Sequence, residues 1–165
     1  MLIILIKKEY ELVDSFFQFL YLLIMKNSSI SSASEYRPKD FNEIIGQDAI
    51  VKTLSNAIDN QKIPQALLFC GPRGVGKTSC ARILAKKIND LDENFEYNIF
   101  ELDAASNNSV EDIRNITEQI RIPPQYGNFK VYIIDEVHML SNAAFNEFLK
   151  SLEEPPPHVV FIIAT

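Results

Sequence analysis

Polar turns divide the chain into segments with two kinds of hydrophobic pattern. Short runs rich in apolar residues are typical of parallel strands that are covered on both faces. These runs lie at residues 66–70, 98–102, 130–134 and 159–163. Elsewhere apolar residues recur every three or four positions, which predicts amphipathic helices. The helical segments are 47–59, 77–88, 110–120 and 142–152. This alternation predicts an α/β fold with a parallel sheet.

The residues around two of these helices agree with the predicted boundaries. Ser109 and Asp112 have the spacing of a capping pair at the start of segment 110–120, and Pro123 follows its end. Ser141 is a predicted N-cap for the last helix, and the prolines at 155–157 stop it.

The first 25 residues are much more apolar than the rest of the chain. Their longest uncharged run, Ser15–Met25, is shorter than the roughly 20 residues that a spanning helix needs, so a membrane anchor is the minor alternative. A simpler hypothesis is that translation begins at Met25 and that residues 1–24 are a start-site artefact. We therefore expect an N-terminal extension over 1–34, serine-rich at its end, and one domain over 35–165.

Composition narrows the classes of function. The 165 residues allow one domain with a core, and the net charge of -6 provides no general basic surface for nucleic acid. Any contact with DNA must then come from a local patch or from partner subunits. Cys70 and Cys80 suit a reducing cytoplasm and core positions, and two thiolates cannot form a four-cysteine zinc site.

The stretch from Ala66 to Ser79, ALLFCGPRGVGKTS, has the order strand, glycine-rich turn, helix start. The pattern G-x-x-x-x-G-K-T in that context predicts a loop for the phosphates of a nucleoside triphosphate. Backbone N–H groups would face the phosphates, with Lys77 at the β- and γ-phosphates and the Thr78 hydroxyl on Mg²⁺. The predicted ATP-binding residues are Gly71, Pro72, Arg73, Gly74, Val75, Gly76, Lys77, Thr78 and Ser79.

An acidic pair, Asp135 and Glu136, follows the apolar run at 130–134. Ligands of open α/β sheets bind at the carboxyl ends of the strands, so we expect these carboxylates beside the phosphate loop. Asp135 is the predicted Mg²⁺ ligand, and Glu136 is predicted to orient and polarise the attacking water. His138 is ambiguous: the string DEVH is similar to the acidic box of nucleic-acid helicases, but a single histidine after a strand is more often structural.

Several longer strings resemble one family, the gamma/tau subunits of bacterial DNA polymerase III, which are the ATPases of the sliding-clamp loader. The strings are YRPKDFNEIIGQ, ALLFCGPRGVGKTSCARILAKKI, FELDAASNNSVEDIR and KVYIIDEVHMLSNAAFNEFLKSLEEPPPHVVFIIAT. They cover nearly all of the chain from Tyr36 to Thr165. The resemblance implies a P-loop NTPase of the AAA+ type, a three-layer α/β/α domain with five parallel strands, of which the printed residues contain four.

The resemblance also assigns roles to individual residues. Lys77 and Glu136 correspond to catalytic positions, and Thr165 lies at or beside the sensor of the γ-phosphate. Arg114 matches a position that approaches DNA in the family. The residues that correspond to the adenine-flanking segment are Tyr36, Arg37, Pro38, Ile44 and Ile45.

The function that the resemblance implies is loading of the sliding clamp onto primed DNA, in the cytoplasm, with ATP and Mg²⁺. The implied partners are other subunits of a hetero-pentamer, the clamp and primer-template DNA, with no membrane. Segment 89–97 has no cysteine, so the zinc module of many members is not expected. The printed residues also stop before the arginine finger and the helical lid of the family, so we expect this chain alone to hydrolyse ATP slowly or not at all. A helicase, or a subunit that binds nucleotide without hydrolysis, is the alternative.

Overall fold

Five strands form one sheet in the order β1-β2-β5-β4-β3. The structure is a computed structural model that describes residues 3–6, 38–89 and 95–165. The strands are β1 (Ile3–Ile6), β2 (Ala66–Cys70), β3 (Ile99–Asp103), β4 (Lys130–Asp135) and β5 (Val159–Ala164). Strands β2, β5, β4 and β3 are parallel to their neighbours, which confirms the four predicted strands and the parallel sheet.

Strand β1 was not predicted, because residues 1–34 were expected to be an N-terminal extension outside the domain. It runs antiparallel to β2, with Ile6 opposite Leu67. The periodicity of a short apolar run does not distinguish a strand from part of a helix. Here the run becomes a strand because it pairs with the edge of β2. The proposed start at Met25 and the serine-rich segment lie outside the described residues. No helix in the described parts of the chain is long and apolar enough to span a bilayer.

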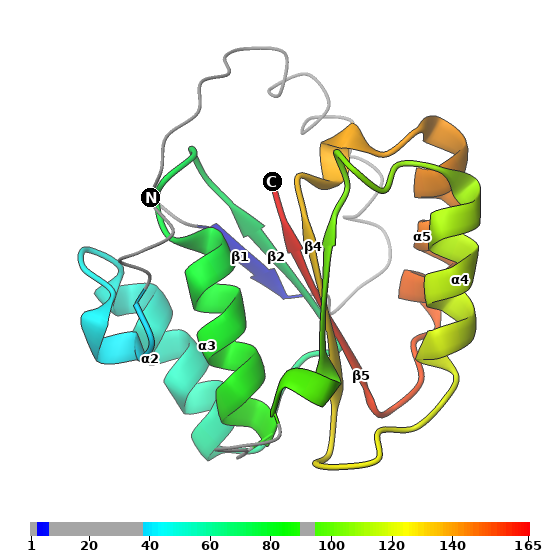
Figure 1. Cartoon of the computed structure of the whole chain (residues 1–165). Coiled ribbons are helices and arrows are strands. Elements are labelled where there is room, and N and C mark those ends of the chain that lie inside the picture. Colours follow the sequence, from blue (N-terminus) through cyan, green and yellow to red (C-terminus); the bar gives the residue numbers. More distant parts are fainter. Residues whose placement is uncertain (1–2, 7–37, 90–94) are drawn as a thin grey trace.

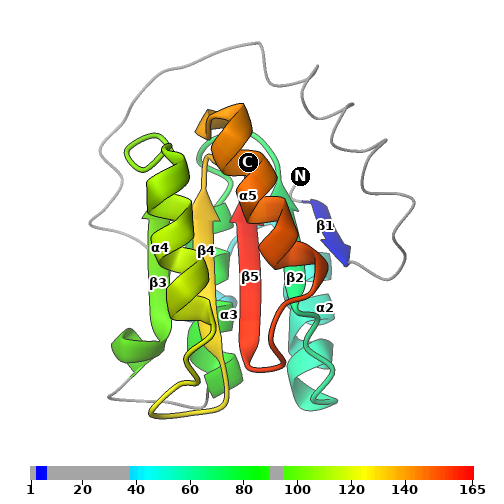
Figure 2. The ribbon, with the colours of Figure 1, turned by 90° about the vertical axis from the view of Figure 1, so that its right-hand side faces the viewer.

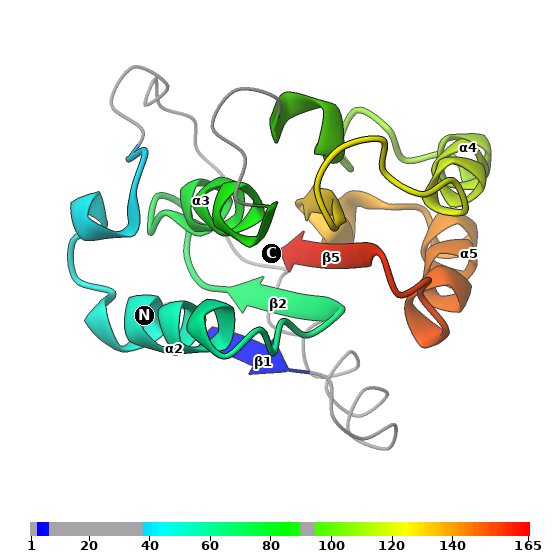
Figure 3. The ribbon, with the colours of Figure 1, turned by 90° about the horizontal axis from the view of Figure 1, so that it is seen from below.

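Helices cover both faces of the sheet. Helices α2 (Asp48–Asp59) and α3 (Lys77–Asn89) lie on one face, and α4 (Val110–Ile120) and α5 (Asn142–Glu153) lie on the other (Figures 1 and 3). Figure 2 shows α4 and α5 in front of the strands. This arrangement confirms the three-layer α/β/α prediction. The structure adds three short 3-10 helices, η1 (Phe41–Glu43), η2 (Phe95–Asn98) and η3 (Val137–Met139).

The strands contribute alternate side chains to two apolar clusters, one in each interface between the sheet and a helix layer. The cluster under α2 and α3 includes Leu54, Phe69, Cys80, Leu84 and Ile162. The cluster under α4 and α5 includes Ile113, Tyr132, Phe148, Phe161 and Ile163. Because the central strands are covered on both sides, their sequences are continuously apolar.

The predicted caps of α4 and α5 are present. The backbone N–H of Asp112 donates to Oγ of Ser109 at 3.2 Å, and the carboxylate of Asp112 in turn accepts from the Ser109 N–H. The N–H of Ala144 donates to Oγ of Ser141 at 3.2 Å. These bonds satisfy N–H groups that have no partner within the helix, so the helix starts could be read from local sequence.

Asn89 connects the end of α3 to the loop before β4. Its Oδ1 accepts from the backbone N–H groups of Asn128 at 3.3 Å and Phe129 at 2.9 Å, and its Nδ2 donates to the Ala85 carbonyl at 3.3 Å. Asn89 is buried, while Phe129 is half-buried and Asn128 is exposed. Asn89 therefore fixes the position at which the chain enters β4.

Candidate nucleotide-binding site

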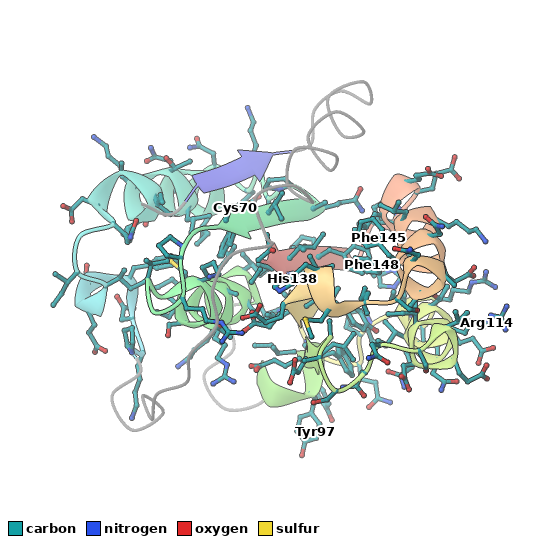
Figure 4. All side chains as sticks on the ribbon, turned by 90° about the horizontal axis from the view of Figure 1, so that it is seen from above. Cys70, Tyr97, Arg114, His138, Phe145 and Phe148 are labelled. Atoms are coloured by element: carbon teal, nitrogen blue, oxygen red, sulfur yellow. The ribbon has the colours of Figure 1, made fainter. Side chains whose placement is uncertain are left out.

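The carboxyl ends of β2, β5 and β4 meet at one edge of the sheet, which Figure 4 shows from above. The loop 71–76 follows β2 and opens α3. The N–H of Gly71 donates to the carbonyl of Thr165 at 3.2 Å, and the N–H of Thr165 donates to the carbonyl of Phe69 at 3.0 Å. The phosphate loop and the end of β5 are therefore bonded to each other through the main chain.

The loop depends on two glycines with left-handed backbone angles. Gly74 has φ +83° and Gly76 has φ +90°. A Cβ atom on either would meet no atom within 4 Å, so backbone conformation rather than crowding favours glycine there. The loop leads directly into the first turn of α3 at Lys77, where free N–H groups and the positive end of the helix dipole favour an anion.

Lys77 is a buried cation with neutral partners. Only 9% of the residue is exposed, and Nζ donates to the carbonyls of Gly71 at 2.8 Å and Pro72 at 3.1 Å. Burial lowers the pKa of Lys77, and the nearby carboxylates of Asp135 and Glu136 partly oppose this effect. The ammonium group is therefore poorly solvated, and a phosphate oxygen would be a better partner than the two carbonyls.

Thr78 and Asp135 come together from α3 and β4. The Thr78 hydroxyl donates to Oδ2 of Asp135 at 2.6 Å, while Oδ1 accepts from the N–H of Glu136 at 3.0 Å. Hydroxyl and carboxylate oxygens are hard ligands of the kind that Mg²⁺ prefers, usually alongside substrate phosphates. The donor set at the end of the phosphate loop thus fits a Mg²⁺ ion that is shared with ATP.

Glu136 follows Asp135 in a left-handed conformation, φ 54° and ψ 41°. Its Oε1 lies 3.2 Å from Nε of Arg73, and its Oε2 lies 3.2 Å from Nε2 of His138. Nδ1 of His138 lies 3.3 Å from Oγ1 of Thr165. Sequence reasoning found no role for His138 in the site and gave Arg73 only a place in the loop. The DEVH string was the available signal for His138.

The predicted adenine-flanking residues are only partly within the described chain. Ile44 is buried in the core cluster under α2 and α3, whereas Ile45 is 95% exposed. Pro38 is half-buried, and Tyr36 and Arg37 lie outside the described residues. The adenine-flanking role of these residues stays a prediction.

Arg114 lies on α4, at the rim of the molecule and away from His138 (Figure 4). Its side chain is 60% exposed, and its NH1 atom is 3.9 Å from Glu111 Oε2. Exposed pairs of this kind contribute little to stability, so the guanidinium is free to exchange partners. Its predicted contact with DNA remains a prediction.

Comparison with known proteins identifies the family. A family model described as DNA polymerase III, delta subunit, matches residues 46–101 and 92–165. The chain is 47% identical over 147 residues to the DNA polymerase III subunit tau of Bacillus subtilis strain 168, and 42% identical over 150 residues to that of Escherichia coli K12. It is also 43% identical over 150 residues to the subunit gamma of Buchnera aphidicola subsp. Baizongia pistaciae. The chain belongs to the gamma/tau family of DNA polymerase III subunits.

The matches cover most of this chain but less than half of each gamma/tau relative. The matches span 79%, 81% and 81% of this chain but only 26%, 23% and 40% of the Bacillus, Escherichia and Buchnera proteins. The description of the family model names the delta subunit, whereas these relatives are gamma and tau subunits of the same polymerase. The intact phosphate loop is consistent with the gamma/tau assignment.

Solved structures support the fold of this gamma/tau family chain. A gamma subunit-related protein of Thermotoga maritima has a TM-score of 0.54 at 22% identity, with 68% of this chain and 38% of that chain covered. The R170A variant of Thermotoga maritima RuvB has a TM-score of 0.58 at 26% identity, with 78% and 41% covered. Both likenesses extend over most of this chain and confirm the AAA+ type of α/β fold.

Proposed function

We propose that the chain is the nucleotide-binding domain of a clamp-loader ATPase and that its site holds ATP with Mg²⁺. The observation that supports this most strongly is the 2.6 Å hydrogen bond from Thr78 to Asp135 beside the buried Lys77. These residues come from two segments 57 positions apart and meet at the end of a glycine-rich loop. A purely structural turn would not need a buried ammonium, a hydroxyl and a carboxylate in one place.

In this proposal each residue has one task. The loop N–H groups and Lys77 bind the phosphates, while Thr78 and Asp135 hold Mg²⁺. A bound Mg²⁺ would neutralise charge on the phosphate oxygens. Glu136 orients and polarises the attacking water, for which its position next to Asp135 is suitable. Thr165 lies at the end of β5, where its hydroxyl could sense the γ-phosphate.

Efficient hydrolysis in this proposal needs a second subunit. The family resemblance implies that an arginine from the neighbouring subunit completes the site, and such residues increase turnover by about 10³ to 10⁵ in comparable systems. The relatives are named as subunits of DNA polymerase III, which supports assembly into that complex. The proposed partners are the other loader subunits, the sliding clamp and primer-template DNA, in the cytoplasm.

Substitution of Glu136 in the full-length subunit tests the proposal. In a reconstituted loader, Glu136→Gln should retain ATP binding and lose clamp- and DNA-stimulated turnover. Glu147→Gln is a matched control, because Glu147 also pairs with a cation, Lys150 at 2.7 Å, but lies on α5. Normal turnover by Glu136→Gln would refute the role of Glu136. Absence of turnover in the wild-type loader would instead favour a subunit that binds nucleotide without hydrolysis.

A helicase is the second candidate, and the position of His138 beside Glu136 is the observation that favours it. ATP-dependent separation of DNA or RNA strands by the full-length protein alone would support it. The identities to gamma and tau subunits favour the loader, because they extend over 79% and 81% of this chain.

A further inference from the structure

The imidazole of His138 lies between two residues of the proposed site that belong to different strands. Its Nε2 is 3.2 Å from Oε2 of Glu136, which follows β4, and its Nδ1 is 3.3 Å from Oγ1 of Thr165, which follows β5. Figure 4 shows His138 at the edge where these strands end. One ring thus lies between Glu136, which is proposed to act on water, and Thr165, which is proposed to sense the γ-phosphate.

The local backbone explains how His138 reaches both residues. Glu136 is left-handed, a conformation that is unfavourable for a non-glycine residue, and it is followed directly by η3. The N–H of Met139 donates to the Glu136 carbonyl at 2.8 Å, and the buried Val137 anchors the turn. The tight turn brings the side chains of residues 136 and 138 together. Backbone strain of this kind is concentrated at functional sites, so the conformation of Glu136 supports a functional role for this turn.

The hydrogen-bonding chemistry of the three groups is complementary. An ionised carboxylate only accepts hydrogen bonds, and a neutral imidazole has one donor and one acceptor nitrogen. Nε2–H of His138 therefore donates to Glu136, which leaves Nδ1 to accept from the hydroxyl of Thr165. In the neutral ring the Glu136 carboxylate fixes the tautomer, because it can only accept, and the Thr165 hydroxyl, which can donate or accept, then donates to Nδ1.

The second oxygen of Glu136 is also engaged. Oε1 pairs with Arg73 of the phosphate loop, whose side chain is 55% exposed, while the side chain of His138 is only 23% exposed. The exposed Arg73 pair is easily exchanged for solvent or another anion. The less exposed His138 contact is the one that can hold the carboxylate in a fixed orientation.

We propose that His138 is a positioning residue that couples the orientation of Glu136 to the Thr165 hydroxyl. The proposal rests on the function proposed above, in which Glu136 acts on water and Thr165 responds to the γ-phosphate. If Thr165 turns away from Nδ1, the ring of His138 keeps only its bond to Glu136 and is no longer held from the end of β5, so Glu136 loses a donor of fixed position. A change in the orientation of the Thr165 side chain is thereby transmitted to Glu136.

Histidine side-chain NMR of the 165-residue chain, without nucleotide, tests this coupling directly. The chain has two histidines, and His158 is an internal control because its Nε2 lies 3.0 Å from the Ile120 carbonyl at the opposite end of the sheet. Glu136→Gln and Thr165→Val should each shift both ring nitrogens of His138 and leave those of His158 unchanged. Resonances of His138 that respond to neither substitution would overturn the proposal.

Kinetics of the reconstituted loader with full-length subunit provide the second test. His138→Ala should lower kcat roughly tenfold and change ATP affinity less than twofold, since residues in one network couple by such amounts. His138→Gln should recover part of the loss, because its amide can still donate toward Glu136. A loss of ATP affinity with unchanged kcat, or no effect on either, would contradict a positioning role.

These tests separate the two proposals. Failure of the wild-type loader to hydrolyse ATP would refute the proposed function, while the NMR result still decides whether His138 senses both neighbours. Thermal unfolding of each variant identifies a variant that does not fold, and His138→Gln, which is similar in size to histidine, then replaces His138→Ala as the decisive variant.

Discussion

The hydroxyl of Thr78 donates a 2.6 Å hydrogen bond to the carboxylate of Asp135 across 57 residues of sequence. Thr78 belongs to the first turn of α3 and Asp135 to the last position of β4. This contact joins the two motifs that the sequence presents separately. It places two hard oxygen ligands at the end of the phosphate loop and is the basis of the first prediction.

Thr78→Val and Asp135→Asn should reduce the effect of Mg²⁺ on ATP binding. In the wild-type chain, Mg²⁺ should increase affinity, whereas in either variant the affinity with Mg²⁺ should fall roughly tenfold toward the value in EDTA, a loss of about 1.4 kcal/mol. Calorimetric titration with and without Mg²⁺ measures this difference.

Asp103→Asn is the matched control for the Mg²⁺ prediction. Asp103 ends the neighbouring strand β3 and lies opposite Asp135 in the register, but its carboxylate accepts from the Ala105 N–H in its own turn. This variant should retain the full Mg²⁺ effect. A full Mg²⁺ effect in Thr78→Val and Asp135→Asn as well would mean that their contact is only structural.

Lys77→Met should weaken ATP binding and stabilise the nucleotide-free chain. Loss of a charged hydrogen bond reduces affinity by roughly 10- to 100-fold. The stability effect follows from the pKa of Lys77, which burial lowers from 10.5 in the folded state. Just below pH 10.5 the unfolded state therefore binds more protons than the folded state, so the free energy of unfolding rises with pH there. At neutral pH, where Lys77 is charged in both states, burial of the charge lowers the free energy of unfolding.

Thermal unfolding and ATP titration of the same Lys77→Met sample measure the two effects together. Lys87→Met on the same helix is the control, because Lys87 forms a half-exposed ion pair with Asp40 at 2.6 Å. It should change neither quantity much. If Lys77→Met lowered the unfolding temperature, the two hydrogen bonds from Lys77 to backbone carbonyls would stabilise the fold by more than burial of the lysine charge destabilises it.

Tyr132→Phe should increase stability, most strongly at alkaline pH. The Tyr132 hydroxyl is buried and has no hydrogen-bond partner among the described residues, and burial raises the pKa of Tyr132 from 10.0 to about 12. The unfolded chain loses this proton first as pH rises from 10 to 12, so wild-type stability falls over that range. At lower pH, removal of the unsatisfied hydroxyl should increase the free energy of unfolding by about 1–3 kcal/mol.

Urea denaturation of Tyr132→Phe from pH 7 to pH 11 measures both parts of this prediction. Tyr126→Phe makes the same chemical change at an exposed position and should leave the curve unchanged. Equal pH dependence in wild type and Tyr132→Phe would show that the phenol ionises with similar ease in the folded and unfolded states.

Asn89→Ala should destabilise the chain by about 1–3 kcal/mol, because two N–H groups lose their acceptor and one of them belongs to a half-buried residue. The affected groups belong to Asn128 and Phe129. The midpoint of urea denaturation should fall with an unchanged slope. Asn60→Ala, at the exposed end of α2, should have a much smaller effect, and a similar effect of both substitutions would contradict the role of Asn89.

Local sequence was sufficient to predict the elements that depend on local chemistry. The continuous apolar run in β5 indicates a strand covered on both faces, and the Ser109 and Ser141 caps fix helix starts within a few residues of sequence. The phosphate loop could be predicted for the same reason, since its glycines, Lys77 and Thr78 are contiguous.

The order of the strands in the sheet became known only from the three-dimensional fold. Strand β5 lies between β2 and β4, although it is the last of the five along the chain. That order places Thr165 beside Gly71 and His138, and it brings Glu136 within reach of Arg73. Hydrophobic periodicity specifies which side chains a strand buries but not which strand lies next to it, because backbone pairing is nonlocal and largely independent of side-chain identity.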